Sequence, residues 1–399
     1  YDGAKLFKLE QNYRSTQAIV EAANSLIKKN SRQIPKNVFS ENAQGDRLVF
    51  KQAYSDKEEA IIVCNDIQRI KSVTHCGYSS FVILYRTNAQ SRSFEESMRK
   101  MNIPYRIYGG LSFYQRKEIK DIVAYFRMVV NPNDEEALRR IINYPTRGIG
   151  DTTVKKIMNA ANEAGVGPWA VICEPDNYPT GLNNGTLRKL ADFRALVDEW
   201  RERSATDDAY HLGHDIIQGS GISKDIYGGR EPEDMSRQEN VDEFLSGMQD
   251  FVESRMEEGM INHVSLGDFL QEIALLTDLD SDDGDNDDKV SLMTIHSAKG
   301  LEFPNVFIVG LEENIFPSPA SCDNPRELEE ERRLLYVAVT RAEKRCVMTC
   351  AKSRFRYGHM EFSSPSRFIR DFAPGLIRID SGNKIDDSEY TVPQYSHRH

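Results

Sequence analysis

The sequence predicts an α/β fold, in which a parallel sheet with helices on both faces is interrupted by a mostly α-helical inserted domain. Predicted strands and helices alternate near both ends of the chain, an order typical of such a sheet. Between these regions the apolar spacing predicts helices almost throughout. Charge separates the same regions: acidic residues outnumber basic ones more than two to one in 134–288, whereas basic residues are in excess in 1–133 and slightly in 289–373.

These observations predict where the domains divide. We expect 1–113 and 286–373 to form the sheet domain, 114–285 to form the helical insertion, and 374–399 to be a flexible tail. Residues 278–288 are rich in Asp and contain no basic residue. In a loop counted from Asp278, Gly284 falls at position 7 and Lys289 at position 12, whereas a calcium-binding EF-hand has Gly at 6 and Glu at 12. We therefore expect a solvated linker that closes the insertion.

The elements follow from apolar spacing along the chain. Apolar residues three and four apart predict a helix over Ser15–Lys29, which Ser15 can cap. The continuous apolar run Phe81–Tyr85 predicts a strand that is covered on both faces. Further strands are expected at 47–54, 104–108, 290–295, 306–309 and 345–349, and further helices at 57–71, 90–101, 326–343 and 364–372. In the insertion, helices are expected at 134–144, 152–163, 186–203, 238–257 and 266–276.

Length and composition exclude several classes of protein. The 399 residues are 39% hydrophobic and 28% charged, which is typical of folded globular domains. No apolar run approaches the ~18 residues that suggest a membrane span. The Cys residues are scattered, so we expect neither a disulfide framework nor a metal site. This pattern fits a reducing compartment, and we expect a cytoplasmic location. The chain begins with Tyr1 rather than Met, which suggests a piece of a longer protein.

The net charge of −11 would by itself argue against nucleic acid as a partner. That number averages over regions of opposite sign, however. Within the acidic insertion, basic side chains gather on both sides of a Gly-Ile-Gly turn at 148–150. Such a turn between two helices exposes backbone N–H groups to a DNA phosphate, so we expect contact with a DNA backbone here rather than an ordinary solvated surface.

Two arginines are placed to meet a phosphate. Arg14 directly precedes the first helix, where a guanidinium beside free N–H groups suits a phosphate, and Tyr13 could offer its ring to a base. Arg341 follows a buried helical run and could act as a finger on a transferring phosphoryl group. The alternatives are a solvated charge for Arg14 and an ion pair with a neighbouring Glu for Arg341.

The end of a predicted strand carries a second polar group. His296 follows the strand, and Lys299 and Glu302 lie in the loop beyond it, a place where parallel sheets bind ligands. His296 could instead be a hydrogen-bonded structural imidazole. Glu302 could bind a ribose hydroxyl or merely cap a turn.

A series of motifs resembles superfamily 1 DNA helicases of the UvrD/PcrA/Rep type. The resemblance covers about residues 6–371. The matching segments are QNYRS at 11–15, VILYRTNAQSR at 82–92, GGLSFYQRKEIKD at 109–121, PTRGIG at 145–150, TIHSAKGLEF at 294–303 and RRLLYVAVTRAEKR at 332–345. It implies an ATP-driven motor that moves 3′ to 5′ on single-stranded DNA, unwinds duplex, and serves repair or replication. This chain would hold the second RecA-like motor domain (2A) and the helical 2B domain inserted into it.

The resemblance also assigns roles to residues of this sequence. It implies that Tyr13 stacks on adenine, that Arg14 and Arg341 contact the γ-phosphate, and that Glu302 binds the ribose. For single-stranded DNA it implies Arg86, Asn88 and His296, with Lys299 beside them. The turn that would grip duplex backbone comprises Arg147, Gly148, Ile149, Gly150 and Thr152.

One departure from the family limits the expected activity. The chain has no GxxxxGK[ST] segment, and its Asp-Glu pairs at 198–199 and 242–243 lie in helical periodicity. The phosphate-binding Lys and the Mg²⁺-binding acids of this family belong to an N-terminal RecA-like domain. We therefore expect this chain alone to be inactive, with ATP and Mg²⁺ bound mainly by that domain. The alternative is a DNA-binding or interaction module without ATPase activity.

Overall fold

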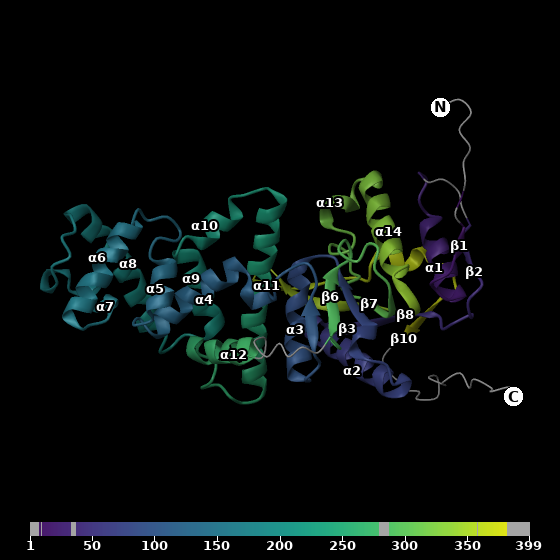
Figure 1. Cartoon of the computed structure of the whole chain (residues 1–399), viewed down its shortest axis with the longest axis horizontal. Helices are drawn as coiled ribbons and strands as arrows, with labels where there is room; N and C mark the ends of the chain where they lie inside the picture. Colours follow the sequence, from purple (N-terminus) through teal and green to yellow (C-terminus); the bar gives the residue numbers. More distant parts are fainter. Residues whose placement is uncertain (1–7, 9, 33–36, 279–286, 357, 381–399) are drawn as a thin grey trace, which may run out of the picture. The chain divides into compact units, whose positions relative to one another are not determined.

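The computed structural model describes residues 8, 10–32, 37–278, 287–356 and 358–380. Contacts within the chain define two compact units (Figure 1). Unit 1 comprises Tyr1–Ser112, Asp283–Arg354 and His359–His399, and unit 2 comprises Phe113–Asp282 and Phe355–Gly358. The short segment Phe355–Gly358 was expected in the sheet domain, but its contacts place it in unit 2.

Unit 1 is built on one parallel sheet. Its strands follow the order β10, β3, β8, β7, β4, β6, β5, and every neighbouring pair along this path is parallel. The bounds are β3 Leu48–Ser55, β4 Phe81–Tyr85, β5 Tyr105–Ile107, β6 Val290–Thr294, β7 Phe303–Ile308, β8 Ala342–Arg356 and β10 Ile377–Asp380, with β9 His359–Phe362 paired to β8. The α/β class predicted from the sequence is confirmed.

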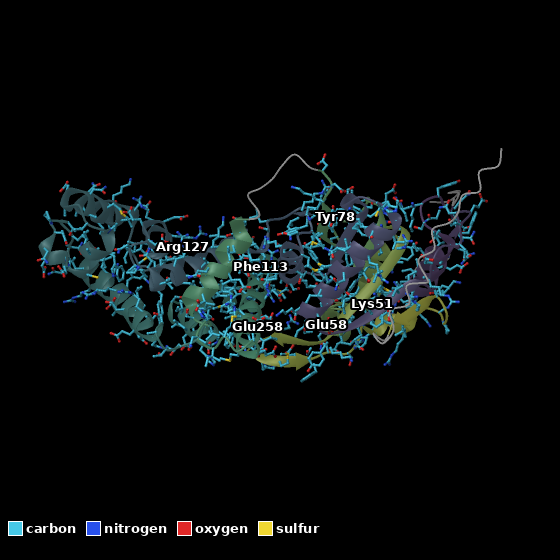
Figure 2. All side chains as sticks on the ribbon, turned by 90° about the horizontal axis from the view of Figure 1, so that it is seen from below. Lys51, Glu58, Tyr78, Phe113, Arg127 and Glu258 are labelled. Atoms are coloured by element: carbon cyan, nitrogen blue, oxygen red, sulfur yellow. The ribbon has the colours of Figure 1, made fainter. Side chains whose placement is uncertain are left out.

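Helices cover both faces of this sheet, as the buried run in β4 requires. Val82 and Leu84 point into a core with α1 (Gln17–Ile27) and α14 (Pro325–Val339), which is preceded by α13 (Pro319–Cys322). Phe81, Ile83 and Tyr85 point into a second core with α2 (Asp56–Thr74) and α3 (Ser91–Lys100). Polar contacts add to this packing: Lys51 of β3, labelled in Figure 2, has its Nζ 2.8 Å from the Asp66 carboxylate of α2.

Three local expectations for unit 1 are wrong. Ser15 does not cap α1; Thr16 holds the N-cap position and its side chain makes no capping bond. The helix expected at 364–372 is only a short 3₁₀ turn, Arg367–Asp371, which ends where the backbone becomes extended at Phe372. The expected flexible tail begins with strand β10, whose apolar Ile377 and Ile379 alternate with charged residues. The rest of that tail, and most of the Asp-rich linker, lie outside the described residues.

Unit 2 is helical. Its helices are α4 Lys117–Val130, α5 Glu135–Ile141, α6 Asp151–Ala164, α7 Pro168–Cys173, α8 Asn184–Arg203, α9 Ala209–Gly219, α10 Ile222–Tyr227, α11 Pro232–Glu257 and α12 Leu266–Asp278. Helix α4 was not among the helices predicted from the sequence, although its less buried residues Lys117, Lys120 and Arg127 recur at helical spacing. Its buried side packs against α5, α8, α11 and α12. In the part of the chain that the structure describes, no helix is both long and apolar enough to cross a membrane.

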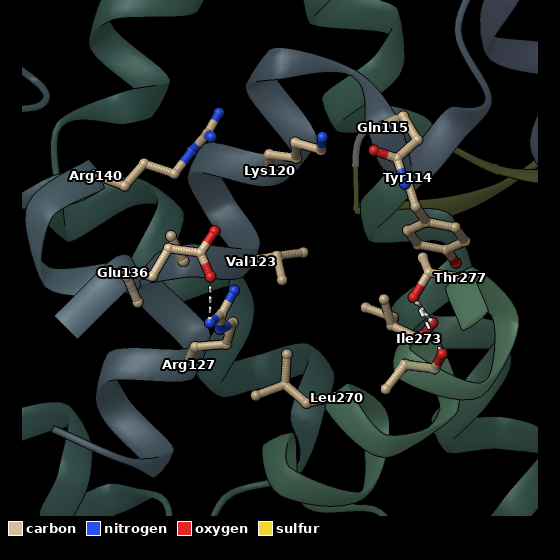
Figure 3. Close-up of a pocket in the computed structure, with 13 residues that line it drawn as sticks. Tyr114, Gln115, Lys120, Val123, Arg127, Glu136, Arg140, Leu270, Ile273 and Thr277 are labelled. Atoms are coloured by element: carbon tan, nitrogen blue, oxygen red, sulfur yellow. Dashed lines mark hydrogen bonds and ion pairs between the residues drawn. The ribbon is translucent and has the colours of Figure 1, made fainter. Parts of the chain in front are cut away.

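Unit 2 also contains a cavity of about 460 Å³ between α4, α5 and α12 (Figure 3). Its floor is apolar, and Arg127 and Arg140 stand at its wall. Both arginines already have partners, because Arg127 binds Asp134 and Glu136, and Arg140 binds Asp121. The cavity therefore offers less free positive charge than its composition suggests.

Candidate functional site

The loop before α1 is fixed to the start of strand β8. The Asn12 side-chain oxygen accepts the backbone N–H groups of Arg14 and Ser15, at 2.8 and 2.9 Å. The Ser15 hydroxyl donates to the carbonyl of Ala342, the first residue of β8, at 2.6 Å. This bond explains why Ser15 cannot cap the helix, and it places Tyr13 and Arg14 beside the start of β8.

The N–H groups that the sequence predicted to be free beside Arg14 are in use. Those of Thr16, Gln17 and Ala18 donate to the backbone carbonyls of Glu343, Ala43 and Gln44, at 3.0, 3.1 and 2.9 Å. The expectation of a helix N-terminus open to phosphate is therefore wrong here. A phosphate near this loop would be bound by side chains instead.

Three of the residues predicted to bind nucleotide converge at the end of the sheet where strands β7 and β8 begin, which is called here the nucleotide edge. Arg14 donates from Nε to the Glu302 carboxylate, which directly precedes β7. Arg341 directly precedes β8, and its carbonyl accepts the N–H of Phe303, the first residue of β7, at 3.0 Å. The sequence therefore brings Arg14, Glu302 and Arg341 together although they are far apart along the chain.

Arg341 is held by backbone oxygens rather than by a carboxylate. Its Nε donates to the Val337 carbonyl at 3.0 Å, and its Nη1 donates to the Leu301 carbonyl at 3.1 Å. Burial lowers the pKa of this guanidinium, the positive charge of Arg14 lowers it further, and Glu302 opposes both. Two guanidinium groups near one another would stabilise an anion bound between them. Tyr13, with 79% of its surface exposed, leaves a ring face open beside them.

The residues expected to contact single-stranded DNA lie at the opposite end of the sheet, where strands β4 and β6 finish. Arg86 follows β4, Asn88 begins a 3₁₀ turn (Asn88–Gln90), and His296 and Lys299 follow β6, which pairs with β4. His296 and Lys299 are exposed. Because β4 and β6 are parallel neighbours, these residues share one end of the sheet.

Glu331 of α14 is a partner of this group that sequence reasoning missed. Its carboxylate accepts from Nη2 of Arg86 at 2.8 Å and from Nε at 3.1 Å, and the carboxylate is nearly buried. The pKa of His296 is lowered, mainly by partial burial and then by the charge of Arg86, whereas Glu331 raises it. Glu331 lies in a charged run that resembles an ordinary helix surface, so only its burial reveals its role.

Replacing Glu331 by Gln should lower the pKa of His296 further. The substitution removes the one negative charge that stabilises the imidazolium and leaves the charge of Arg86 unopposed. An NMR titration of the His296 ring in this chain measures the pKa. Glu330→Gln, on the neighbouring residue that pairs with Arg333, should leave it unchanged. A His296 pKa that stays constant or rises in Glu331→Gln would contradict the geometry.

In unit 2, Arg147 lies within the turn rather than on its surface. Its Nη2 donates to the Tyr125 hydroxyl at 2.6 Å and to the Ser220 carbonyl at 2.9 Å, and its Nη1 donates to nearby backbone carbonyls. The guanidinium also stacks over the Phe193 ring. This arrangement favours a role in holding the turn over the DNA contact that the sequence predicted.

The turn itself presents backbone donors to solvent. Asn143 accepts the N–H groups of Arg147 and Ile149, both at 3.0 Å, and Ile149 is fully buried. Gly148 adopts φ +70° and Gly150 is the N-cap of α6, with no side-chain cap. Among the described residues, no acceptor was found for the N–H groups of Gly148, Gly150, Asp151 and Thr152. Lys189 reaches the Gly148 carbonyl at 3.1 Å and adds a cation.

Gly150→Asp should separate DNA binding from folding at this turn. A side chain at Gly150 meets open space, and Asp is a favoured N-cap, so the variant should be as stable as the native chain or more stable by about 0.3 kcal/mol. Its carboxylate would occupy the exposed N–H groups and repel phosphate. Thermal unfolding and duplex binding measure the two effects.

A matched control for Gly150→Asp adds the same charge at another helix. Asn183→Asp changes the N-cap of α8 in the same unit and should leave duplex binding unchanged. Gly148→Asp is a poorer probe, because the added side chain would be strained and would meet Lys189. Unchanged duplex affinity in Gly150→Asp would remove the turn from the list of DNA contacts.

In the described part of the chain, no three or more His, Cys, Asp or Glu side chains gather as they would to hold a metal ion. The cluster at the starts of β7 and β8 consists instead of the guanidiniums of Arg14 and Arg341, the carboxylate of Glu302 and the exposed ring of Tyr13. Their chemistry suits a phosphorylated ligand with an aromatic base.

A family model described as the UvrD-like helicase C-terminal domain matches residues 7–353. The match extends over most of the chain, and the chain therefore belongs to the UvrD-like helicase C-terminal domain family.

Particular relatives are named ATP-dependent DNA helicase PcrA. The chain is 40% identical over 377 residues to the protein of Leuconostoc citreum, covering 94% of this chain and 50% of the relative. It is 39% identical over 386 residues to that of Staphylococcus epidermidis, covering 96% and 52%. The chain thus spans about half the length of the curated relatives it matches. A solved structure described as the C-terminal domain of a possible DNA helicase from Lactobacillus plantarum gives a TM-score of 0.35 at 10% identity, covering 92% of this chain and 98% of that one.

Proposed function

We propose that this chain is the C-terminal portion of an ATP-dependent DNA helicase. It would supply the second RecA-like motor domain and the helical 2B insertion of an enzyme that moves 3′ to 5′ on single-stranded DNA and unwinds duplex. Work in DNA repair or replication, in the cytoplasm, would follow from that activity. The observation that supports it best is the convergence of Arg14, Glu302 and Arg341 at one edge of the sheet.

At this edge the chain would contribute part of an ATP site. Tyr13 would stack on adenine, Glu302 would bind the ribose, and Arg14 and Arg341 would contact the γ-phosphate. The Arg14–Glu302 ion pair would have to open for these contacts to form, so both groups would exchange one partner for the nucleotide. The phosphate-binding Lys and the carboxylates for Mg²⁺ would come from the other motor domain.

Helix α14 offers a physical route between nucleotide and DNA. Glu331 on this helix holds Arg86 at the edge proposed for single-stranded DNA, and Arg341 follows the end of the same helix at the proposed nucleotide edge. A shift of the helix on ATP binding would therefore reach Arg86 and, beside it, His296. In the insertion, the turn at 148–150 would hold duplex backbone through its exposed N–H groups.

Binding of this chain to a single-stranded oligonucleotide over a series of salt concentrations tests the DNA half of the proposal. Each phosphate contact contributes about −0.7 to the slope of log affinity against log salt concentration. Arg86→Ala should therefore make the slope less steep by about 0.7. Binding that does not depend on salt would contradict the assigned arginine and lysine contacts.

A further inference from the structure

The edge strand β5 presents two side chains on an uncovered part of the sheet. Tyr105 and Ile107 pack into the core formed with α2 and α3. Side chains alternate along a strand, so Arg106 and Tyr108 point to the opposite face. The alternation extends to Tyr108 because its N–H continues the ladder to the Leu292 carbonyl at 2.9 Å. Both side chains are exposed, Tyr108 to 47%.

This face and this end of the sheet are those that carry the proposed single-strand contacts. The carboxyl ends of β4, β6 and β5 lie side by side in that order. Tyr85 points into the α2 and α3 core, so Arg86, the next residue, turns to the face of α14, where it binds Glu331. Arg86, Arg106 and Tyr108 therefore share one face.

The loop after Tyr108 also lies close to the His296 loop. Gly109 adopts φ +77°, and a side chain there would come within 3.5 Å of the Ser297 hydroxyl. Ser297 is the neighbour of His296, and its hydroxyl lies 2.9 Å from that of Thr294 at the end of β6. An exposed aromatic ring thus stands next to a group of cationic and polar side chains.

An exposed ring interleaved with arginines is the pattern by which proteins bind single-stranded nucleic acid, with bases on the ring and phosphates on the cations. Arg106 has its Nε 3.3 Å from the Ser291 hydroxyl and is otherwise directed to solvent. We propose that Tyr108 is a stacking platform for a base of single-stranded DNA and that Arg106 binds the adjoining phosphate. This inference rests on the proposed function and extends the single-strand site to the edge of the sheet.

The test compares oligo(dT) with an abasic oligonucleotide of the same length, each titrated with this chain. Tyr108→Ala should weaken oligo(dT) binding by about 5- to 150-fold, the range for the loss of one base–aromatic stack. It should leave abasic binding unchanged, because no base is present to stack. Tyr108→Phe should bind like the native chain. Tyr54→Ala, at an exposed tyrosine near the end of β3, serves as the control and should leave both affinities unchanged.

Salt dependence separates the two proposed roles. Tyr108→Ala should keep the native slope, since the ring is neutral, whereas Arg106→Ala should make it less steep by about 0.7. A native chain that binds oligo(dT) while Tyr108→Ala binds it equally well overturns this inference alone. Equal loss of oligo(dT) and abasic binding in Tyr108→Ala also overturns it, because it would indicate a structural defect. A native chain that binds neither oligonucleotide overturns both this inference and the proposed function.

Discussion

Replacing Arg341 by Ala should lower kcat for ATP hydrolysis by ~10³–10⁵-fold in a protein that joins this chain to a Walker-bearing motor domain. The guanidinium is fixed by the carbonyls of Val337 and Leu301, so it is already positioned before a nucleotide arrives. Arg341 lies close enough to Arg14 for the two charges to interact, so two guanidiniums stand near the place proposed for the γ-phosphate. Steady-state turnover with saturating single-stranded DNA measures the effect.

Arg333→Ala is the matched control, because Arg333 lies on the same helix and pairs with Glu330 and Glu329 at its surface. Its turnover should stay near that of the native protein. Arg14→Ala should resemble Arg341→Ala if both arginines contact the transferring phosphoryl group. Normal turnover with weakened DNA binding in Arg341→Ala would assign the residue to nucleic acid instead.

Replacing Arg354 by Met should destabilise unit 1 by roughly 3–5 kcal/mol. Arg354 is buried in β8 and binds the Glu59 and Glu312 carboxylates at 2.6 and 2.7 Å, and both of these are fully buried. Removing the guanidinium would leave two buried carboxylates without their cation. For a unit of this size the lowered stability corresponds to a fall in Tm of roughly 6–20 °C, measured by thermal unfolding.

The pH dependence of this loss has a defined sign. Burial already raises the pKa of Glu59, and Arg354 opposes that rise. Without Arg354 the carboxyl would protonate at higher pH, and protonation removes the buried charge. The stability difference between the variant and the native chain should therefore shrink as the pH falls. Arg367→Met, which removes a surface pair with Glu313, should cost less than ~1 kcal/mol at any pH. An equal effect of the two substitutions would contradict the role assigned to burial.

Much of the sheet could be predicted because its signals are local. A run such as Phe81–Tyr85 has no charged side chain and is apolar at every position except the Tyr85 hydroxyl, so it is expected between two layers. Elements that depend on distant partners were harder. Strand β10 forms because it pairs with β3, which is distant in the sequence, and the residues Ile377–Asp380 alone do not indicate that partner. Helix α4 was missed although its sequence is amphipathic, with Lys117, Lys120 and Arg127 at helical spacing on one side and buried residues on the other.

In the candidate site too, the residues could be predicted from local signals, whereas their distant partners could not. The sequence suggested Arg14, Glu302 and Arg341 as candidates, and their convergence depends on the parallel order of β7 and β8. It did not predict the partners that decide what each side chain can do. Arg86 is held by Glu331, and Arg147 is held by carbonyls and a tyrosine hydroxyl, although both look like free surface cations in the sequence.

The proposed function requires that this chain carry part of an ATP-driven motor and need a second motor domain to work. ATP turnover measured with single-stranded DNA, first on the chain alone and then on the chain joined to a Walker-bearing motor domain, tests it most directly. We expect no DNA-stimulated turnover by the chain alone, and a kcat in the ordinary enzymatic range of ~1–10³ s⁻¹ once the two are joined. Turnover near ~1 s⁻¹ by the chain alone, or none by the joined protein, would contradict it.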